Sequence, residues 1–424
     1  MFSANKHIND YLYYGYLFPS KIPDWFFDID GVNKEHRSYS IKEVSTLFDR
    51  IADKVPSEIT GNNYCIVPIS GGWDSRLLLG AAVERLNISQ IKTFSFGTPG
   101  QLDYEIGCKV AHALGLEHYL IDLREFEINW NLLEQTAREA PWTKTLDAFY
   151  NKYCIKKIGT DSDIVLSGFM GDPLAGSHTI SSSDKKEIIS SFVKHQNIAK
   201  NSALLEKDYD PISSVPDIPQ KIDFDPGELL DFGIRQAYMV APIVTPLPEM
   251  KNWGSKPGAL PGTGMQILTP FADTSWASYW ISAPVHLKEN RKLFFEMFKD
   301  KYPELYNMPA KDYFGAAKKN ALKRSMNRNL IRIQNRLHLY APQWFNQSRK
   351  MMNYLDFDDA FRSRDDYQAV LKKAISYMQK KTIAPWIDFD QMWEEHMTFK
   401  ANHSKSFKVF IGLALNLKVK NEPR

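Results

Sequence analysis

Residues 64–76 read Tyr-Cys-Ile-Val-Pro-Ile-Ser-Gly-Gly-Trp-Asp-Ser-Arg, and this stretch decides the fold. The apolar run from Tyr64 to Ile69 is typical of a buried parallel strand. The Ser-Gly-Gly that follows predicts a bend, and beyond Ser75 the apolar residues recur at helical spacing. We therefore predict a strand, a glycine-rich bend and a helix start in direct succession.

This succession of elements forms a cradle for phosphate. Glycines let the backbone approach an oxyanion, and the N–H groups at the helix start point towards it. Each such charge-assisted hydrogen bond contributes about 1.5–3 kcal/mol, so several can hold a pyrophosphate without a basic side chain. Asp74 would repel phosphates unless it binds a Mg²⁺ ion that neutralises them. The alternative is a plain strand–helix turn whose glycines serve only its tightness.

The composition is that of an ordinary globular protein. The 424 residues suffice for two or three domains, or for one large domain with appendages. With 53 basic and 50 acidic residues the net charge is only +3, so nucleic acid is not expected as a partner. The sequence has no apolar run long enough to span a membrane and no signal peptide at its start. We expect a cytoplasmic protein without a membrane partner.

The three cysteines, Cys65, Cys108 and Cys154, form no Cys-x-x-Cys pair. They indicate free thiols in a reducing compartment rather than disulfides or metal ligands. The histidines are scattered without a His-Glu-x-x-His pattern, so no zinc site is expected.

Strands and helices alternate through the first 170 residues. Predicted strands cover 64–69, 92–96, 118–122 and 163–166, and predicted helices between and before them cover 41–55 and 103–114. This alternation predicts an α/β fold with a doubly wound parallel sheet. Ligands of such sheets bind at the carboxyl ends of the strands, where the loops after Ile69, Phe96 and Leu166 lie.

The remainder of the chain is predicted to be mainly helical. An aromatic helix covers 8–18, 179–225 form a polar insertion, and 249–264 form a flexible loop. Further helices are expected at 276–283, 290–300, 316–336, 357–377 and 390–398. A stripe of lysines and arginines on the 316–336 helix indicates a solvated face, with contact to RNA or another polyanion as the alternative. We divide the chain into a helical lead-in (1–56), a main domain (57–345) and a helical extension of that domain (346–424).

Several segments together resemble a known family. They are Tyr-Leu-Tyr-Tyr-Gly-Tyr from residue 11, Ser-Gly-Gly-Trp-Asp-Ser at 70–75, Thr-Phe-Ser-Phe-Gly at 93–97, Ser-Gly-Phe-Met-Gly-Asp-Pro-Leu at 167–174, Pro-Phe-Ala-Asp at 270–273, Pro-Ala-Lys-Asp-Tyr-Phe-Gly at 309–315, and Trp393 with His396. In this order they resemble the synthetase domain of the asparagine synthetase family, which includes β-lactam synthetases and lasso-peptide cyclases. The segment at 70–75 resembles the PP-loop of N-type ATP pyrophosphatases, which split ATP into AMP and PPi. A Walker loop is absent.

The resemblance implies a fold of the ATP-pyrophosphatase (adenine nucleotide alpha hydrolase-like) type and a nucleotide site at the sheet edge. The residues that it assigns to ATP are Ile69, Ser70, Gly71, Gly72, Ser75, Arg76, Phe96, Ser167 and Gly168. Among them, Phe96 would line the adenine, and Arg76 would either face the pyrophosphate or lie on the helix surface. Asp74 and Asp172 would bind Mg²⁺. Lys311 would stabilise negative charge on the α-phosphate and on the tetrahedral intermediate.

Three positions depart from the family pattern. Residue 2 is Phe rather than the cysteine nucleophile of a glutaminase domain, so we expect no glutamine hydrolysis by this chain. Phe169 replaces the usual carboxylate or tyrosine of the second signature, and Pro173 replaces its glutamate. The residues of adenylation are thus retained, while those on the acceptor side differ.

The expected activity is an ATP-dependent amide-forming ligation. A carboxylate would react with ATP to give acyl-AMP and PPi, and ammonia or an amine would then displace AMP. A separate glutaminase is one source of the ammonia, and the carboxylate would be a small molecule or a peptide. The alternatives are a PP-loop enzyme that modifies RNA, and a non-catalytic nucleotide-binding remnant.

Overall fold

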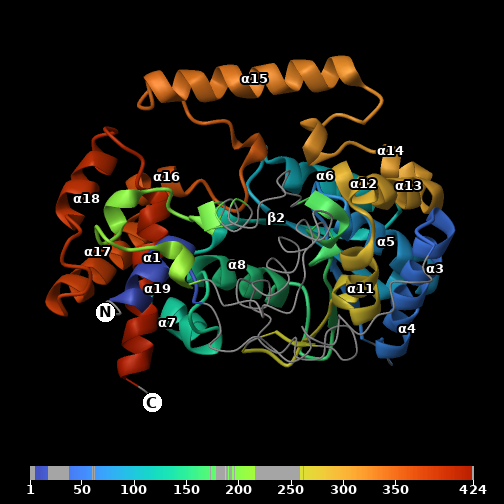
Figure 1. Ribbon diagram of the computed structural model, residues 1–424, viewed down its shortest axis with the longest axis horizontal. Helices are drawn as coiled ribbons and strands as arrows, with labels where there is room; N and C mark the ends of the chain where they lie inside the picture. The colour runs from blue at the N-terminus through green and yellow to red at the C-terminus, as the bar shows by residue number, and fades with distance from the viewer. Residues whose placement is uncertain are drawn as a thin grey trace.

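The computed structural model describes residues 5–17, 38–59, 61, 63–171, 173–177, 187, 190, 193–194, 196–214, 258–260 and 262–422. Within these ranges the chain is an α/β protein whose helices gather on both sides of a central sheet (Figure 1). The predicted α/β class is therefore confirmed. None of the described helices is both long and apolar enough to cross a membrane.

The sheet has the strand order β3-β2-β1-β4-β6-β5. The first five strands in this order are parallel, and β5 pairs antiparallel with β6 at one edge. The strands are β1 (Cys65–Pro68), β2 (Ile91–Gly97), β3 (Glu117–Asp122), β4 (Ile164–Leu166), β5 (Gly258–Ala259) and β6 (Gln266–Leu268). The parallel sheet and its first four strands agree with the prediction, whereas β5 and β6 were not predicted.

The central position of β1 explains its apolar sequence. Ile66 lies beside Lys92 of β2 on one side and beside Val165 of β4 on the other. Cys65, Ile66 and Val67 have no exposed surface. A parallel strand that is covered on both faces needs apolar residues at successive positions. This placement brings the glycine-rich bend after β1 to the middle of the carboxyl edge of the sheet.

The helices of the first part of the chain precede β1 or connect the strands β1 to β4. They are α1 (Lys6–Tyr14), α3 (Ile41–Ala52), α4 (Lys54–Glu58), α5 (Asp74–Arg85), α6 (Leu102–Ala113), α7 (Trp130–Glu139) and α8 (Thr145–Lys156). Gly15 and Gly115 follow α1 and α6 with positive φ angles, and because α1 ends at Tyr14 the helix predicted for 8–18 is too long.

Beyond residue 270 the described chain is mainly helical, as predicted. Its helices are α11 (Thr274–Ser282), α12 (Val285–Lys288), α13 (Lys292–Lys301), α14 (Pro303–Asn307), α15 (Ala321–Tyr340), α16 (Phe357–Ser363), α17 (Asp365–Lys380), α18 (Phe389–Met397) and α19 (Ser404–Asn421). The single helix predicted at 357–377 is wrong, since Arg364 has an extended backbone that separates α16 from α17.

The two ends of the described chain pack together (Figure 1). The helix α19 is buried along most of its length against α17, α7 and α1. Its Asn416 accepts the Trp142 N–H at 2.5 Å and donates to the Gly412 carbonyl at 2.8 Å. Residues of the lead-in and of the C-terminal extension therefore share one hydrophobic core with the sheet.

Two predicted loops fall largely outside the described residues. Of the insertion at 179–225, the described part includes 196–214, which contains short 3₁₀ turns. Of the loop at 249–264, Gly258 and Ala259 form strand β5, so the prediction of a loop is wrong at these two positions.

Candidate active site at the carboxyl edge of the sheet

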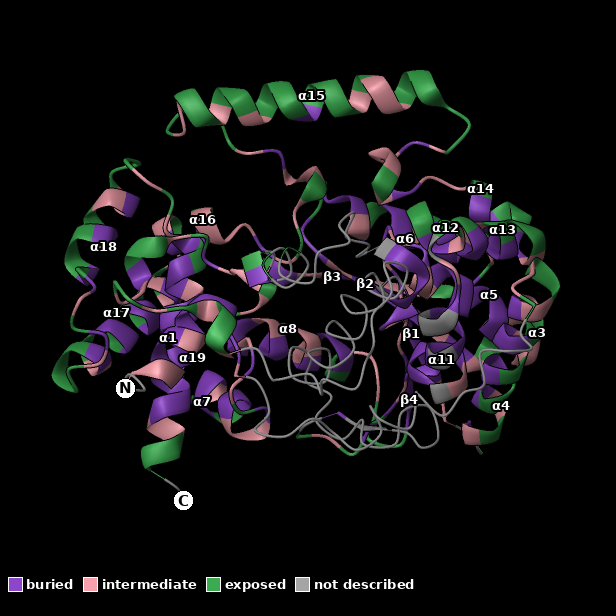
Figure 2. Ribbon diagram, in the orientation of Figure 1, coloured by how far each residue is buried: buried purple, intermediate pink, exposed green. Residues whose placement is uncertain are grey.

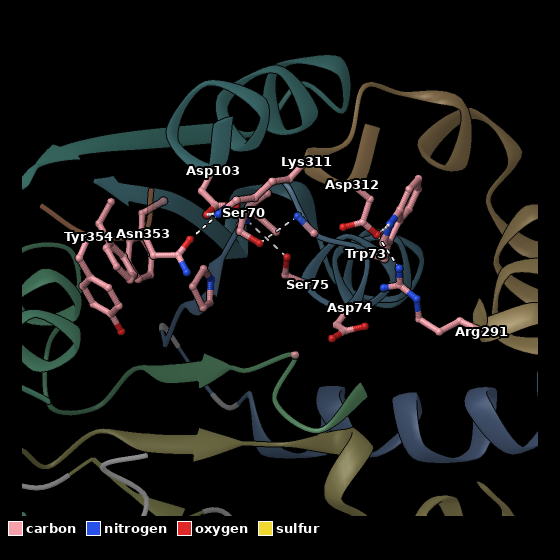
Figure 3. A pocket seen from close by; sticks show the side chains of 16 residues that line it. Ser70, Trp73, Asp74, Ser75, Asp103, Arg291, Lys311, Asp312, Asn353 and Tyr354 are labelled. Carbon is pink, nitrogen blue, oxygen red and sulfur yellow. Dashed lines mark hydrogen bonds and ion pairs between the residues drawn. The ribbon is translucent and has the colours of Figure 1, made fainter. Parts of the chain in front are cut away.

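A cavity of about 450 Å³ lies at the carboxyl ends of β1 and β2, beside the loop that follows β4 (Figure 3). The 3₁₀ turn Lys311–Tyr313 and the segment Asn353–Tyr354 close it from the helical half. Most of the predicted site residues line this cavity, namely Ile69, Ser70, Gly72, Asp74, Ser75, Phe96, Gly168 and Lys311. Segments separated by more than 200 residues thus contribute to one wall.

The glycine-rich bend is folded tightly around its own serines. The Gly72 N–H donates to the Ser70 hydroxyl at 3.1 Å, and the Ser70 N–H donates to the Ser75 hydroxyl at 3.4 Å. A Cβ atom on Gly71 would lie 3.0 Å from the Cβ of Lys311. Glycine is therefore needed at this position because the segment that carries Lys311 packs directly against the bend.

Trp73 anchors the bend to the helical half of the chain. Its indole is buried and donates from Nε1 to the Asp312 carboxylate at 2.9 Å. Four aromatic rings surround it at centroid distances of 5.2–6.0 Å, those of Phe295, Phe298, Tyr306 and Tyr313. Trp73 precedes α5 and provides no side-chain hydrogen bond to the start of that helix, which leaves this helix end facing the cavity uncapped by a side chain.

Lys311 reaches the cavity from a short turn rather than from a helix. Its backbone N–H donates to the Gly71 carbonyl at 2.9 Å. Its ammonium group donates to the Asp103 carboxylate and to the Asn353 side-chain oxygen. The second oxygen of Asp103 accepts the Gly71 N–H at 3.0 Å. One carboxylate therefore connects the glycine-rich bend to the lysine. Figure 3 shows Asp103 beside Lys311.

A second ion pair lies at another part of the cavity wall. Arg291 donates to the Asp312 carboxylate at 2.5 Å, so that this carboxylate also bridges the arginine and the Trp73 indole. The Arg291 guanidinium lies 4.7 Å from the centre of the Phe295 ring. In Figure 3, this pair and Tyr354 lie at opposite ends of the cavity, with Asp74 and Ser75 between them.

The end of the cavity at Tyr354 is aromatic. The rings of Phe96 and Tyr354 are 5.4 Å apart, and Phe94 lies 6.2 Å from Phe96. The side-chain amide of Gln101 donates to the Tyr354 carbonyl at 2.5 Å, which ties this residue to the loop after β2. The result is an apolar wall at one end of an otherwise polar cavity.

The loop after β4 packs closely on the start of α5. A Cβ atom on Gly168 would lie 2.8 Å from the Ser75 nitrogen, and one on Gly171 would lie 2.8 Å from the Asp74 carboxyl carbon. The Asp74 side chain is therefore held at the junction of the loops that follow β1 and β4. Asp172, the predicted partner of Asp74, lies outside the described residues.

Among the described residues of the predicted site, Gly71, Ser167 and Arg76 do not line the cavity. Gly71 contributes through its backbone contacts with Asp103 and Lys311. Ser167 donates from its N–H to the Leu268 carbonyl at 2.8 Å, and its hydroxyl accepts the Phe169 N–H at 3.3 Å. Ser167 therefore holds the loop after β4 in place instead of facing the cavity.

The expectation for Arg76 is wrong in both of its forms. The side chain is completely buried, and its guanidinium donates to the carbonyls of Leu305 (3.1 Å) and Pro309 (2.8 Å). Burial lowers the pKa of Arg76 to about 10. Arg76 therefore neither lines the cavity nor lies on the helix surface. It fixes the backbone segment that leads to Lys311.

Sequence reasoning missed Asp103, Arg291, Asp312, Asn353 and Tyr354 as cavity residues. Asp103 had a usable signal, because it opens the helix after β2 and β2 ends at the same edge of the sheet. Asp312 also had one, because it follows Lys311 in the motif at 309–315, whereas the remaining three belong to no quoted motif. Asn353, for example, is 42 residues away from the lysine that it contacts.

Of the two predicted Mg²⁺ ligands, Asp74 is the one that lies within the described residues. Within the described ranges, no group of three or more His, Cys, Asp or Glu side chains is arranged to hold a metal ion. Any divalent ion bound beside Asp74 would therefore complete its ligands with groups outside the described residues or with phosphate oxygens.

The sequence matches no protein-family model with which it was compared. No curated protein matches it either. A function for this chain therefore has to be inferred from the cavity and from the motifs that form it.

Proposed function

We propose that this protein is an ATP-dependent ligase of the ATP-pyrophosphatase type that adenylates a carboxylate and passes the acyl group to ammonia or an amine. The observation that carries the proposal is the convergence of three features on one cavity. These are the glycine-rich bend with its helix start, the Asp74 carboxylate and the Lys311 ammonium. Each suits a different part of an adenylation reaction.

The cavity suits Mg²⁺–ATP in size and in the order of its walls. Its volume of about 450 Å³ is in the usual range of ligand pockets, about 300–1,000 Å³. The N–H groups at the start of α5 would hold the β- and γ-phosphates, since those of the bend itself already donate to side chains. The rings of Phe96 and Tyr354 would cover the adenine. Asp74 would be a ligand of Mg²⁺, which neutralises the phosphate charge when bound.

The reaction has two steps. A carboxylate oxygen of the substrate attacks the α-phosphorus of ATP, the bond to the β-phosphate oxygen breaks, and PPi leaves. The amine nitrogen then attacks the acyl carbon, the bond to AMP breaks, and the nitrogen gives up a proton to form the amide. Negative charge develops at the α-phosphate in the first step and on the carbonyl oxygen in the second. Lys311 is the cation that we assign to both.

Asp103 and Asn353 have a positioning role in this proposal. Both accept hydrogen bonds from the Lys311 ammonium, and neither is asked to contact the reacting atoms. A lysine side chain has four rotatable bonds, so fixing its end before the reaction avoids an entropy loss in the transition state. Asp103 also aligns the lysine with the phosphate-binding bend, because the same carboxylate accepts the Gly71 N–H.

The likeness of the motifs to those of asparagine synthetases supports amide formation as the second step. Phe169 cannot act as a base, and its ring is packed against the hydrophobic core. The acceptor side therefore differs from the family pattern, and the amine is a free one or ammonia from a separate glutaminase. ATP as a substrate and the free cysteines Cys65, Cys108 and Cys154 fit a cytoplasmic enzyme.

The test is carboxylate-dependent exchange of radiolabelled PPi into ATP in the presence of Mg²⁺. A panel of amino acids, peptides and sugar acids is screened with the wild-type chain and with Asp74→Asn. We expect exchange with at least one carboxylate and none with the variant. Exchange that requires added tRNA would instead support RNA modification. Nucleotide binding without exchange under any condition would support the non-catalytic remnant.

A further inference from the structure

The helix α15 is set apart from the body of the protein (Figure 1). It is exposed over nearly its whole length (Figure 2), and Ile331 is its one buried residue. The chain enters α15 from the turn that carries Lys311 and returns to the cavity at Asn353. The segment that contains α15 is therefore an excursion of the chain. It leaves the body of the protein at the candidate active site and returns to the body there.

The contacts of α15 define which side faces the body. Asn327 donates to the Phe314 carbonyl at 2.8 Å, and Asn335 accepts the Ser348 N–H at 2.9 Å. Ile331 lies between them along the helix and is buried. Since residues three to four apart share one helix face, these three residues mark the inner side of α15.

The opposite side of α15 carries an exposed apolar stripe. Its members recur every three or four residues and are 42–80% exposed, namely Leu322, Met326, Leu330, Ile333, Leu337 and Tyr340. Two further exposed aromatic residues, Trp344 and Phe345, follow the end of the helix. A continuous apolar face directed away from the body of a protein marks a binding surface.

The charges beside the stripe all have one sign. Lys323, Arg324, Arg328, Arg332 and Arg336 lie on α15, and residues 321–340 include no Asp or Glu. Arg328, Arg332 and Arg336 form a row at intervals of four, and all three are exposed. None of these three forms an ion pair within the described part of the chain. The surface is thus both apolar and basic.

We infer that α15 lies in the interface of a phospholipid bilayer that carries anionic headgroups. An apolar stripe enters the acyl boundary of a membrane, flanking arginines bind the headgroup phosphates, and exposed Trp and Tyr residues prefer the level of the headgroups. A second copy of this chain fits less well, because paired stripes would bring arginine rows together without any acidic residue to compensate. Nucleic acid would leave the apolar stripe in water.

This inference does not require a membrane-spanning segment. The expectation that no membrane is a partner depended on the lack of an apolar run long enough to cross a bilayer, and a helix in the plane of the surface needs no such run. The inference is also independent of the proposed reaction, since it concerns a surface that contains no residue of the cavity.

The experiment is sedimentation of the full chain with vesicles of phosphatidylcholine, with or without one-third phosphatidylglycerol. The apolar variant is Met326→Ser/Leu330→Ser/Ile333→Ser, and the basic variant is Arg328→Gln/Arg332→Gln/Arg336→Gln. The controls are Ile88→Ser/Leu120→Ser and Lys380→Gln/Lys381→Gln, each of which changes two exposed residues of the same kind away from α15. Circular dichroism and thermal unfolding verify that each variant is folded.

We expect the wild-type chain and both controls to sediment with the anionic vesicles, and the apolar variant to stay in the supernatant. The basic variant should partition about 100-fold more weakly at low salt, since each basic residue near an anionic surface contributes a several-fold gain. A wild-type chain that ignores anionic vesicles, or an apolar variant that binds like the wild type, would overturn the inference. Light scattering that shows a dimer for the wild-type chain and a monomer for the apolar variant would also overturn the inference, since the stripe would then serve self-association.

Discussion

The Asp74 carboxylate is a suitable target for a substitution that removes charge without changing the shape of the side chain. It lies at the start of α5, and the backbone of Gly171 packs against it. The substitution Asp74→Asn keeps the shape of the side chain and removes only the charge that would bind Mg²⁺. We expect PPi release to fall at least about 100-fold, because a metal ion at developing charge contributes several kcal/mol.

The control for this prediction is Asp161→Asn. Asp161 is exposed and precedes β4, so it lies at the opposite edge of the sheet from the cavity. Its variant should release PPi at the wild-type rate. Equal rates for wild type and Asp74→Asn, with unchanged thermal stability, would contradict the role assigned to Asp74.

Lys311 provides a second prediction at the level of a single residue. The substitution Lys311→Ala should lower turnover about 10²–10³-fold, the effect of removing one donor to a developing oxyanion. ATP should bind almost as well as before, because the interaction strengthens mainly in the transition state. Turnover and ATP affinity are measured separately, by PPi release and by calorimetry.

The matched control is Lys318→Ala, since the Lys318 ammonium contacts the Tyr306 hydroxyl and does not line the cavity. It should retain turnover. Asp103→Asn should lie between the two variants, because the lysine keeps its charge and loses one of its two positioning partners. If Lys318→Ala were inactive and Lys311→Ala active, the catalytic lysine would have been misassigned.

Single residues also show how far sequence reasoning reached. The bend, Asp74, Gly168 and Lys311 were placed at one edge because each belongs to a motif or follows a predicted strand. Arg76 was misjudged because it occupies a position in α5 that faces the α14 segment, and only the tertiary fold determines what a helix residue faces. Asn353 was missed for the same reason, since its contact with Lys311 depends on the path of the 314–352 excursion.

At the level of elements, the contact between the β4 loop and α5 gives a prediction about glycine. A methyl group on Gly168 would approach the Ser75 nitrogen to 2.8 Å, so Gly168→Ala has to separate the loop from the helix start. We expect a loss of stability of about 1–3 kcal/mol together with a clear loss of ATP affinity. Thermal unfolding and calorimetry measure the two effects.

Gly80→Ala serves as the comparison, because its added methyl group meets the Tyr302 ring at 3.0 Å on a part of α5 outside the cavity wall. It should alter stability and leave ATP affinity unchanged. An unchanged ATP affinity in Gly168→Ala would show that the packing of these two loops does not shape the nucleotide site.

Some helices and strands could not be predicted from sequence patterns. The helix α19 was not predicted, although it has 18 residues, because it is apolar on nearly all sides and lacks the periodic pattern of a surface helix. The strands β5 and β6 have only two and three residues and border a Gly- and Pro-rich stretch. Their pairing is decided by contacts across the sheet rather than by their own sequence.

At the scale of the whole molecule, a buried histidine predicts how stability depends on pH. His396 has no exposed surface, and its Nδ1 accepts the His403 N–H at 3.2 Å. Burial, together with the nearby charge of Arg362, lowers its pKa to about 3, compared with about 6.5 for an exposed histidine. Burial also lowers the pKa of His118, to about 4.

The direction of this pH dependence follows from the protons that the histidines bind in the folded and in the unfolded chain. Below about pH 6.5 the unfolded chain takes up protons at these histidines, while the folded chain keeps them neutral. The free energy of unfolding should therefore fall as the pH decreases from 6.5 to 4.5, by up to about 1.4 kcal/mol per pH unit for each histidine. In this window most carboxylates remain ionised.

The variant His396→Asn tests the assignment, because the amide oxygen can accept the same N–H without titrating. Urea unfolding at several pH values should show a shallower decrease for this variant than for the wild type. The same slope in both proteins would mean that other groups dominate the pH dependence.

The excursion from residue 314 to 352 leaves and re-enters the body beside one contact, between the ammonium of Lys311 and the side-chain oxygen of Asn353. Such a detour is a modular unit. Loop-closure free energy rises only about 0.6 kcal/mol for each doubling of length, so the content of the detour can be exchanged at little energetic cost to the body. Replacing the 20 residues of α15 should therefore change the surface that this helix can bind, while the cavity beside Lys311 and Asn353 is kept.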